Sequence, residues 1–282
     1  MTVAGASGSR EALDGAVDAL RAAGVEDPRL DAEVLLAAAT GRERAALVAG
    51  AEIEPAASRR FGEMVRRRLR REPVAYIVGS KGFRGIELTV GPQVLIPRPE
   101  SELLVELALE RRPATLLDVG TGSGAIALAV ADELPDCEVT ATDTSPSALG
   151  VARANAERLG LGDRVRFLSG SLPDEEDFEL VVANLPYVAE TEWAALQPEV
   201  TRWEPRQALL SGLDGLDAIR ALIAECGCHG SRYAGVVTTA LALEVGAGQA
   251  GAVAELMAEA GFLAIETRRD LAGIDRVVVG EL

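Results

Sequence analysis

The stretch Phe178-Glu179-Leu180-Val181-Val182-Ala183-Asn184-Leu185-Pro186-Tyr187 places a short apolar run directly before a tetrapeptide with polar groups. The run predicts a buried strand of a parallel sheet, and the tetrapeptide predicts the loop at its carboxyl end, where open α/β sheets hold their ligands. The Asn184 side-chain oxygen can accept hydrogen bonds from an –NH2 group, and the Tyr187 ring offers a flat surface for a planar amide or base. Pro186 restricts Leu185 to extended backbone, so the Leu185 carbonyl becomes a second, directed acceptor. Taken alone, the four residues fit a plain strand-to-loop turn with a buried tyrosine equally well.

The second half of the chain alternates predicted strands with predicted helices, as in a parallel sheet covered on both faces. Ser145 and Pro146 are suitable as the N-cap and first residue of one of these helices. The predicted strands are Thr115–Val119, Glu138–Thr142, Val165–Leu168, Phe178–Ala183, Val236–Val245 and a pair formed by Phe262–Thr267 and Arg276–Gly280. The predicted helices are Glu100–Glu110, Ala125–Glu133, Pro146–Leu159, Leu216–Ala224 and Ala250–Ala260.

The first part of the chain, from about Arg10 to Val78, has apolar residues at helical spacing and predicts a small all-helical domain. Pro28 and Pro55 stand where helices would begin. The fourth predicted helix is rich in arginine and contains Arg59, Arg60, Arg66, Arg67, Arg68, Arg70 and Arg71. Such a run is typical of a solvated helix face, and the alternative is a docking surface for an anionic partner.

Two short extended runs, Phe83–Val90 and Val94–Pro99, follow this domain and are separated by Gly91-Pro92. They predict a hairpin that links the domains. We therefore divide the chain into residues 1–79, a helical domain, residues 80–99, a hairpin linker, and residues 100–282, an α/β domain.

The composition limits the classes of function. With 282 residues and 48% hydrophobic residues, the chain can form roughly two packed domains. A formal net charge of −16 argues against stable binding to a nucleic-acid backbone. Three cysteines are too few for a disulfide framework, and neither a signal peptide nor an apolar stretch long enough to span a bilayer is present. We expect a cytoplasmic protein without a membrane partner and, since the sequence gives no sign of oligomerisation, a monomer.

A glycine-rich segment, Asp118-Val119-Gly120-Thr121-Gly122-Ser123-Gly124-Ala125, joins the first strand of the alternation to the helix after it. Glycines allow a sharp turn and close approach to a ligand, and the helix start presents free N–H groups. The spacing also fits dinucleotide-binding loops. Asp118 favours a cofactor with a cationic end over a pyrophosphate, although it could also be a turn carboxylate. Asp143, at the end of the next strand, can accept hydrogen bonds from ribose hydroxyls.

These segments together resemble a known family. The glycine loop Gly120-Thr121-Gly122-Ser123-Gly124 resembles the S-adenosylmethionine loop of class I methyltransferases, and Asn184–Tyr187 resembles the Asn-Pro-Pro-Tyr motif of amino-methyltransferases. Ile96-Pro97-Arg98-Pro99-Glu100-Ser101-Glu102 is similar to the Ile-Pro-Arg-Pro-Glu-Thr-Glu signature of the PrmC/HemK family. Further matches are Glu204-Pro205-Arg206, Leu243-Glu244-Val245-Gly246 with Gln249, and Asp270–Arg276.

The resemblance implies a class I methyltransferase fold, Rossmann-like with a mostly parallel seven-stranded sheet, preceded by a helical domain and a β-hairpin linker. It makes residues 1–79 a substrate-recognition domain and residues 100–282 the S-adenosylmethionine-dependent catalytic domain. It implies methylation, by S-adenosylmethionine, of the glutamine side-chain nitrogen (N5) in the Gly-Gly-Gln motif of peptide chain release factors. Catalysis would then fall to Asn184, Leu185, Pro186 and Tyr187. The cofactor would be held by Asp118, Gly120, Thr121, Gly122, Ser123, Gly124, Asp143, Ser171 and Asn184.

Two positions depart from the family pattern. Leu185 replaces the first proline of the tetrapeptide, but the backbone carbonyl that the family uses is still present. After Phe167-Leu168, where relatives often carry an acidic residue and an aromatic, this chain has Ser169-Gly170-Ser171-Leu172, so the adenine pocket is unassigned.

Three alternative functions remain open from the sequence: an adenine-N6 nucleic-acid methyltransferase with a similar tetrapeptide, a nicotinamide-dependent oxidoreductase, and a non-catalytic binding protein. The net charge and the helical domain count against the first, and the second leaves Asn184–Tyr187 unexplained. Cys226-Gly227-Cys228-His229 lacks the second ligand pair of a structural zinc site, so we expect a loop there and no metal.

Overall fold

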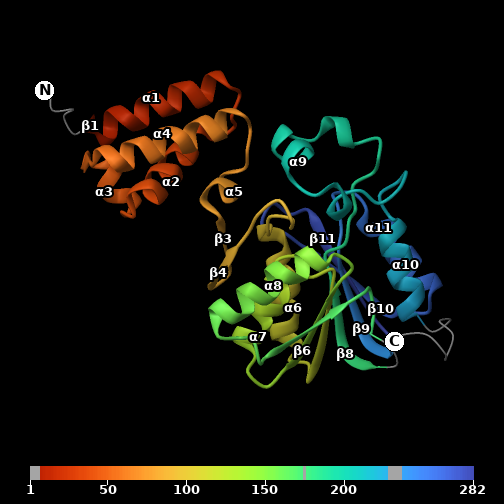
Figure 1. Ribbon diagram of the computed structural model, residues 1–282. Coiled ribbons are helices and arrows are strands. Elements are labelled where there is room, and N and C mark those ends of the chain that lie inside the picture. The colour runs from red at the N-terminus through yellow and green to blue at the C-terminus, as the bar shows by residue number, and fades with distance from the viewer. Residues whose placement is uncertain (1–6, 174–175, 228–236) are drawn as a thin grey trace, which may run out of the picture. The chain divides into compact units, whose positions relative to one another are not determined.

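The computed structural model describes residues 7–173, 176–227 and 237–282, which form two compact units. One unit, called the helical unit, contains the chain through Ser80 together with Gln197–Trp203. The other, called the sheet unit, contains Lys81–Leu196 and Glu204–Leu282. A short segment from the second half of the sequence therefore belongs to the helical unit (Figure 1).

The helical unit packs amphipathic helices around one apolar core that includes Leu13, Leu20, Leu35 and Phe61. Its helices are α1 (Ser9–Ala22), α2 (Pro28–Thr40), α3 (Arg44–Val48), α4 (Pro55–Leu69), α5 (Val74–Val78) and α9 (Pro198–Trp203). Pro28 and Pro55 begin helices, as the sequence predicts, because a proline at the first helical position loses no hydrogen bond. A pair of two-residue strands, β1 (Ser7–Gly8) and β2 (Glu52–Ile53), adds to the predicted helices.

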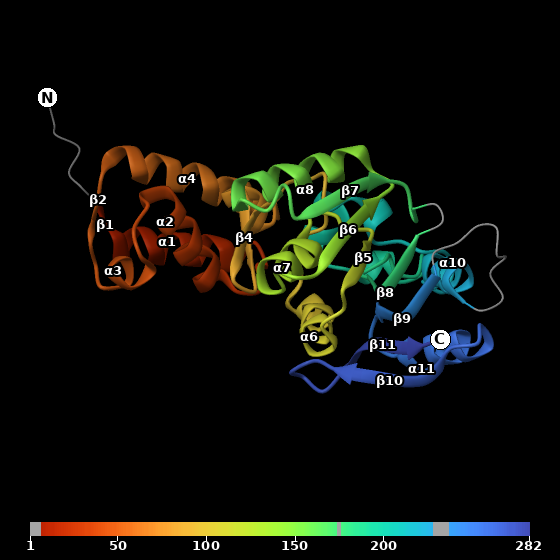
Figure 2. The same ribbon diagram turned by 90° about the horizontal axis from the view of Figure 1, so that it is seen from below.

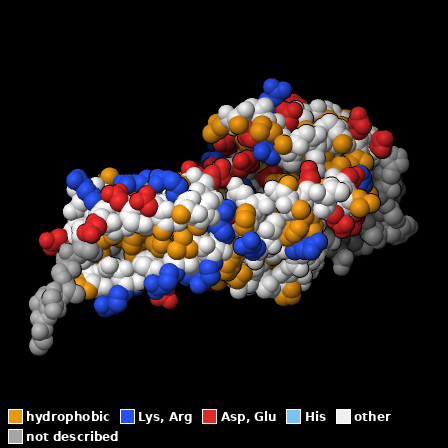
Figure 3. All heavy atoms as spheres, turned by 90° about the horizontal axis from the view of Figure 1, so that it is seen from above, with side chains coloured by type: hydrophobic (Ala, Val, Ile, Leu, Met, Phe, Trp, Pro, Cys, Tyr) orange, Lys and Arg blue, Asp and Glu red, His pale blue; other side chains and the backbone are white. Residues whose placement is uncertain are grey.

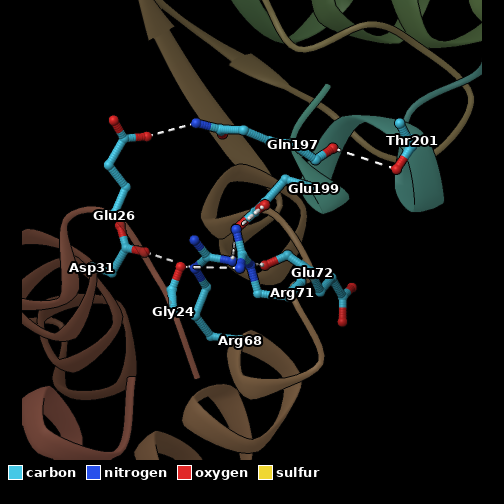
Figure 4. A network of polar contacts seen from close by, with 9 residues as sticks. All are labelled: Gly24, Glu26, Asp31, Arg68, Arg71, Glu72, Gln197, Glu199 and Thr201. Carbon is cyan, nitrogen blue, oxygen red and sulfur yellow. Dashed lines mark hydrogen bonds and ion pairs between the residues drawn. The ribbon is translucent and has the colours of Figure 1, made fainter. Parts of the chain in front are cut away.

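The segment that ends in α9 is held to the helical unit by buried ion pairs (Figure 4). Arg71 donates to both carboxylate oxygens of Glu199, at 2.6 and 2.7 Å. Arg68 lies 2.7 Å from the same carboxylate and also donates to Asp31 at 2.6 Å. Gln197 donates to Glu26 at 2.6 Å. Because two guanidinium groups converge on one buried carboxylate, the position of α9 on this unit is fixed by charge as well as by packing.

The sheet unit is built on a seven-stranded sheet with the order β10-β11-β9-β8-β5-β6-β7. Its strands are β5 (Thr115–Val119), β6 (Glu138–Asp143), β7 (Val165–Ser169), β8 (Asp177–Ala183), β9 (Val237–Glu244), β10 (Leu263–Arg269) and β11 (Asp275–Glu281). The pairs from β9 through β8, β5 and β6 to β7 are parallel, and β11 runs antiparallel to both of its neighbours. The mostly parallel sheet predicted from the sequence is confirmed.

Helices cover both faces of this sheet, which is why its central strands are apolar on both sides. One group, seen on one side of the sheet in Figure 2, contains α6 (Glu102–Arg111), α7 (Ala125–Glu133) and α8 (Pro146–Leu159). The other contains α10 (Asp217–Cys226) and α11 (Ala250–Glu259). Residues Leu180 to Ala183 of β8 are almost completely buried, as expected for a central strand. The N-cap role predicted for Ser145 is confirmed, since its hydroxyl accepts a hydrogen bond from the Ala148 N–H.

The predicted hairpin is present, but its strands differ from the prediction. Strands β3 (Ser80–Phe83) and β4 (Ile86–Thr89) pair with each other around Arg84-Gly85, not around Gly91-Pro92. The expected second strand, Val94–Pro99, is wrong: this segment forms no ladder. Two prolines remove backbone donors from it, and the Ile96 N–H donates to the Glu204 side chain instead.

Candidate active site

A cavity of about 230 Å³ lies in the sheet unit at the carboxyl ends of β5, β6 and β8. It is where ligands bind in open α/β sheets. The predicted site residues that line it are Gly120, Thr121, Gly122, Ser123, Asp143, Ser171, Asn184, Leu185 and Pro186. Its apolar wall includes Val94, Leu95, Ile126 and Ala148. The fold thus brings together residues from six separate sequence segments: 93–101, 119–126, 143–148, 170–171, 184–186 and 205–208.

The glycine loop has the backbone that its composition predicts. Gly120, Gly122 and Gly124 have φ values of 75°, 58° and 86°, a left-handed region that side chains disfavour. A Cβ atom at Gly120 would lie 3.1 Å from the Leu185 side chain, so any larger residue there would crowd the loop against the tetrapeptide. The Gly120 and Thr121 N–H groups both donate to the Thr142 carbonyl at 2.9 Å, which fixes the loop on the end of β6.

Asp118 lies beneath this loop and is not among the residues that line the cavity. One of its oxygens, Oδ2, accepts from the Thr121 hydroxyl at 2.6 Å and from the Ala127 N–H at 3.2 Å. Burial raises the pKa of this carboxyl to about 6. The other oxygen, Oδ1, is buried and has no partner within the described residues. The geometry therefore favours the turn-carboxylate alternative for Asp118, because its bonds hold the loop to the start of α7.

Asp143 ends β6 with its carboxylate at the cavity. Its Oδ2 accepts from the Gly122 N–H at 2.9 Å and its Oδ1 from the Ser145 N–H at 2.8 Å. Each oxygen keeps one further lone-pair position for a ligand hydroxyl. Ser171, the other candidate on this side, is an exposed residue whose carbonyl accepts from the Thr142 hydroxyl at 2.7 Å. Asp143 is thus both a support of the loop and a polar group of the cavity wall.

Asn184 takes part in a chain of hydrogen bonds that leads into the protein interior. Its Nδ2 donates to the Ser101 hydroxyl at 2.9 Å, and that hydroxyl donates to Glu244 Oε2 at 2.6 Å. Glu244 is 1% exposed. Burial, with a contribution from the charge of Glu100, raises the pKa of its carboxyl to about 7, although hydrogen bonds from Ser101 and Tyr187 and the charge of Arg276 oppose the shift. Within the described residues, Asn184 Oδ1 accepts no hydrogen bond from the protein.

The rest of the tetrapeptide divides between the cavity and the interior. Leu185 and Pro186 line the cavity. Tyr187 does not: its hydroxyl lies 3.4 Å from Glu244 Oε1, and its carbonyl accepts from Gln249 Nε2 at 2.9 Å. Burial raises the pKa of the Tyr187 phenol. Its expected stacking against a planar substrate stays a prediction.

Two further contacts hold the cavity wall together. Glu204 accepts from the Ile96 N–H at 3.1 Å and forms an ion pair with Arg98. These contacts join the loop after the hairpin to the segment of Pro205 and Gln207, which also lines the cavity. Asn155 of α8 is fully buried and bonds both to the Thr89 backbone and to the Ser123 carbonyl. The hairpin, α8 and the glycine loop are therefore one hydrogen-bonded assembly.

Sequence reasoning assigned no role to Ser101, Asn155, Glu204 or Glu244. Glu244 carried a usable signal, since it is an acidic residue that directly follows the apolar run Ala240–Leu243 at the end of a strand beside β8. Ser101 and Glu204 stood inside quoted motifs but had no partner that the sequence could identify. In the Cys226–His229 segment, Cys226 is buried, while Cys228 and His229 lie outside the described residues. The described part of the chain contains no cluster of potential metal ligands and no helix long and apolar enough to cross a bilayer.

Comparisons with known proteins agree with this architecture. Residues 11–79 match the family model for the PrmC N-terminal domain, and residues 116–203 match a methyltransferase domain. The crystal structure of a methyltransferase from Pyrococcus furiosus is similar in fold, with a TM-score of 0.52 and 18% sequence identity over 71% of this chain and 91% of that one.

Sequence relatives extend over nearly the whole chain. The release factor glutamine methyltransferase of Geobacter sulfurreducens is 41% identical over 97% of this chain and 96% of its own length. The one from Cereibacter sphaeroides is 42% identical over 96% of this chain and 98% of its own length. With a class I methyltransferase sheet, a matching helical region and this degree of identity, the chain belongs to the family of release factor glutamine methyltransferases.

Proposed function

We propose that this protein methylates the side-chain amide nitrogen (N5) of the glutamine in the Gly-Gly-Gln motif of peptide chain release factors and thereby supports translation termination. The observation that carries the proposal is the 41% identity with a release factor glutamine methyltransferase over 97% of the chain. The position of Asn184 and Leu185 at the cavity agrees with it. The match favours this function over an adenine-N6 methyltransferase and over a nicotinamide-dependent oxidoreductase.

The residues around the cavity suit S-adenosylmethionine. At Gly120 and Gly122 the glycine loop has no side chain between its backbone and a ligand, and the Asp143 carboxylate offers acceptor positions for a ribose diol. The apolar wall formed by Val94, Ile126 and Ala148 can cover an uncharged ring. When bound, the cofactor supplies an electrophilic methyl group on a positively charged sulfur. We assign its binding to the glycine loop, Asp143, Ser171 and Asn184, with Asp118 as the support beneath the loop.

The chemistry requires the protein to direct a weak nucleophile, since the lone pair of an amide nitrogen is delocalised into its carbonyl. Two acceptors at the cavity, Asn184 Oδ1 and the Leu185 carbonyl, can take the two N–H protons of the substrate amide. These bonds raise electron density on nitrogen and fix the direction of its lone pair, so catalysis rests mainly on positioning. No residue need act as a base before transfer, because the proton can leave to water afterwards.

The helical unit is proposed to recognise the substrate, and residues 80–99 to connect it to the catalytic part. Fewer arginines of α4 are available to a partner than the sequence suggests, because several are bonded within the helical unit. Arg67 bonds Glu72, Arg68 bonds Asp31 and Glu199, and Arg60 bonds the Ala39 carbonyl. Arg59, Arg66 and Arg70 are exposed. On the face drawn in Figure 3, basic side chains of the helical unit are interspersed with acidic and hydrophobic ones. Reversing the charges of Arg59, Arg66 and Arg70 together should raise the KM for the release factor, and unchanged kinetics would remove this surface from the proposal.

We further propose that the protein acts in the cytoplasm as a monomer. We also propose that it forms no stable complex with nucleic acid, and the net charge of −16 supports this second point. The deciding experiment incubates the purified protein with methyl-labelled S-adenosylmethionine and a release factor, in parallel with the same factor carrying alanine in place of the Gly-Gly-Gln glutamine. Label on the first factor alone is the expected result. Label on neither factor but on DNA or RNA would replace the proposal with the adenine-N6 function.

A further inference from the structure

An asparagine amide presents two groups of nearly the same shape and opposite hydrogen-bonding character. Only Oδ1 can accept an N–H from a substrate, so the proposed function requires Asn184 to keep this atom toward the cavity. A reversed amide would present its own N–H groups to those of the substrate. The site therefore needs a feature that selects one of the two orientations of the side chain.

The hydrogen bonds behind Asn184 contain such a feature. The Ser101 hydroxyl has one proton, and it lies 2.6 Å from Glu244 Oε2, which in its ionised form can only accept. Once the proton is used there, Ser101 Oγ has only lone pairs left for the atom 2.9 Å away on Asn184. That atom must then be the donor Nδ2. The orientation follows from proton counting and does not depend on how the amide atoms are assigned.

We propose that Ser101 and Glu244 are positioning residues that fix the Asn184 amide with its oxygen toward the substrate. This inference rests on the proposed function for its consequence in catalysis. Ser101 lines the cavity but is only 3% exposed, and Glu244 lies behind it and is 1% exposed. We assign both an action through Asn184.

The ionisation of Glu244 controls the direction of the chain of hydrogen bonds. A protonated Glu244 can donate to Ser101 Oγ, and the Ser101 proton is then free to donate to Asn184 Oδ1, which selects the reversed amide. Among the described residues, the charged or titratable groups that act most strongly on Glu244 are Glu100, Tyr187 and Arg276. The pKa of about 7 places this change within the pH range in which the enzyme can be assayed. Activity should therefore rise with pH as Glu244 ionises.

Replacing Ser101 by alanine separates positioning from packing. In S101A the part-buried Nδ2 loses its acceptor, and because an unpaired N–H away from water is less tolerated than an unpaired carbonyl, the amide should turn its NH2 group to the cavity. We expect kcat/KM for the release factor to fall about 5- to 100-fold, as the competent orientation becomes a minor population. S101T keeps the hydroxyl and should stay within about 3-fold of the unsubstituted protein.

The matched control is T238V, which also removes a buried hydroxyl, one that donates to the Ala240 carbonyl on the same strand as Glu244. This variant should change kcat/KM less than about 2-fold, as a change away from the site does. That S101A is folded is checked by its circular dichroism spectrum and its urea-unfolding midpoint, which should match those of the unsubstituted protein. An S101A enzyme as active as the unsubstituted one, or an S101T enzyme as impaired as S101A, would overturn the proposal.

The pH profile gives a second test. Between pH 6 and 8, kcat/KM should rise for the unsubstituted enzyme and stay flat in E244Q, which cannot ionise. A rise of the same size in E244Q would overturn the role of Glu244.

A third readout does not depend on methyl transfer. The Asn184 NH2 protons should be protected from solvent exchange in NMR spectra of the unsubstituted protein and lose this protection in S101A. If the unsubstituted protein fails to methylate the release factor, the proposed function falls, and the NMR result still decides the orientation of Asn184. Unprotected NH2 protons in the unsubstituted protein would contradict it.

Discussion

Glu199 in the helical unit and Glu244 in the sheet unit are both buried carboxylates, yet their surroundings act in opposite directions. Burial disfavours the charge of Glu199, but hydrogen bonds from Arg71 and Arg68 outweigh burial and lower its pKa below the ordinary value. Glu244 has no arginine in direct contact among the described residues. Its partners are two hydroxyl groups, and burial raises its pKa to about 7.

The difference separates a structural carboxylate from one that can serve a reaction. A carboxylate held by two guanidinium groups has a lowered pKa and is ionised at neutral pH, so the direction of its hydrogen bonds does not change there. A carboxylate held by hydroxyls is close to neutrality, and its protonation state sets the direction of the hydrogen bonds it makes. In this protein only the second kind is connected to Asn184.

The largest expected effect comes from removing the acceptor that Glu244 supports. In N184A the substrate amide loses one of its two proposed hydrogen-bond acceptors, and kcat/KM for the release factor should fall about 10²- to 10³-fold. Steady-state methylation with labelled cofactor measures it. Calorimetry with S-adenosylhomocysteine separates the part that comes from the predicted cofactor contact of Asn184. An enzyme that keeps more than about a tenth of its activity would exclude Asn184 from catalysis.

The next effect tests the other carboxylate. In E199Q the two arginines lose their charged partner, and breaking a buried ion pair of this kind should destabilise the helical unit by about 3 kcal/mol. The chain has two tryptophans, and Trp203 lies in the segment that contains Glu199. With Trp193 replaced by phenylalanine, urea unfolding followed by Trp203 fluorescence reports on this unit.

The matched control for E199Q is D18N, because Asp18 forms an exposed ion pair with Arg21 and should matter by less than about 1 kcal/mol. If the two variants had equal stability, the ion pairs of Glu199 would be of no more consequence than a surface pair. The dissociation constant of E199Q for S-adenosylhomocysteine should stay unchanged, since the contacts that this variant loses are all in the helical unit.

The two carboxylates should also give opposite pH dependence of stability. The pKa of Glu244 is higher in the folded protein than in the unfolded chain, so its stabilising contribution is complete below about pH 4.5 and is lost as the pH rises through about 7. Asp118, with a pKa of about 6, has the same sign. The pKa of Glu199 is lowered, so its contribution is present above about pH 4.5 and is lost as the pH falls through the folded value.

Unfolding of the sheet unit can be followed by Trp193 fluorescence once Trp203 is replaced by phenylalanine. Between pH 5 and 8 the free energy of unfolding should fall by about 2 kcal/mol more with Glu244 present than in E244Q. The remaining slope in E244Q belongs to Asp118. Equal slopes in the two proteins would mean that Glu244 titrates normally, and the contrast with Glu199 would disappear.

The smallest effect is expected at Leu185. A side-chain acceptor such as Asn184 needs partners behind it, whereas the Leu185 carbonyl is oriented by its own backbone and by Pro186. L185P restores the family tetrapeptide and keeps this carbonyl, so kcat/KM should change less than about 3-fold. A much larger loss, measured in the same assay, would show that the contact of the Leu185 side chain with Gly120 is needed for the shape of the cavity.

Much of the fold follows from the sequence, because it depends on patterns within single segments. The apolar runs that became β5 and β8, the helix after Ser145-Pro146, and the left-handed glycines of the loop are all determined by residues close together in the chain. The convergence of the glycine loop and Asn184 is also predictable, because the carboxyl ends of parallel strands meet at one edge of a sheet.

The remaining features depend on which distant partner a side chain meets. Asp118 could face a cofactor or hold a turn, and only the position of the α7 start, whose Ala127 N–H it binds, decides between them. The bond from Ser101 to Glu244 spans 143 residues, and that from Arg71 to Glu199 spans 128. The turn of the hairpin was predicted at the wrong place because Gly91-Pro92 is the stronger turn signal by composition. The actual turn contains Arg84, whose left-handed φ of 47° cannot be predicted from its residue type.

Because Gln197–Trp203 belongs to the helical unit, this unit cannot be completed early in the synthesis of the nascent chain. As the protein emerges from the ribosome, the N-terminal helices appear first. The partner of Arg71, Glu199, lies 128 positions later in the chain and is synthesised only afterwards. Until then, the partly formed unit carries buried or half-buried guanidinium groups without Glu199. The first domain to be synthesised is thus completed only after the central strands of the second have left the ribosome, so the two should mature together.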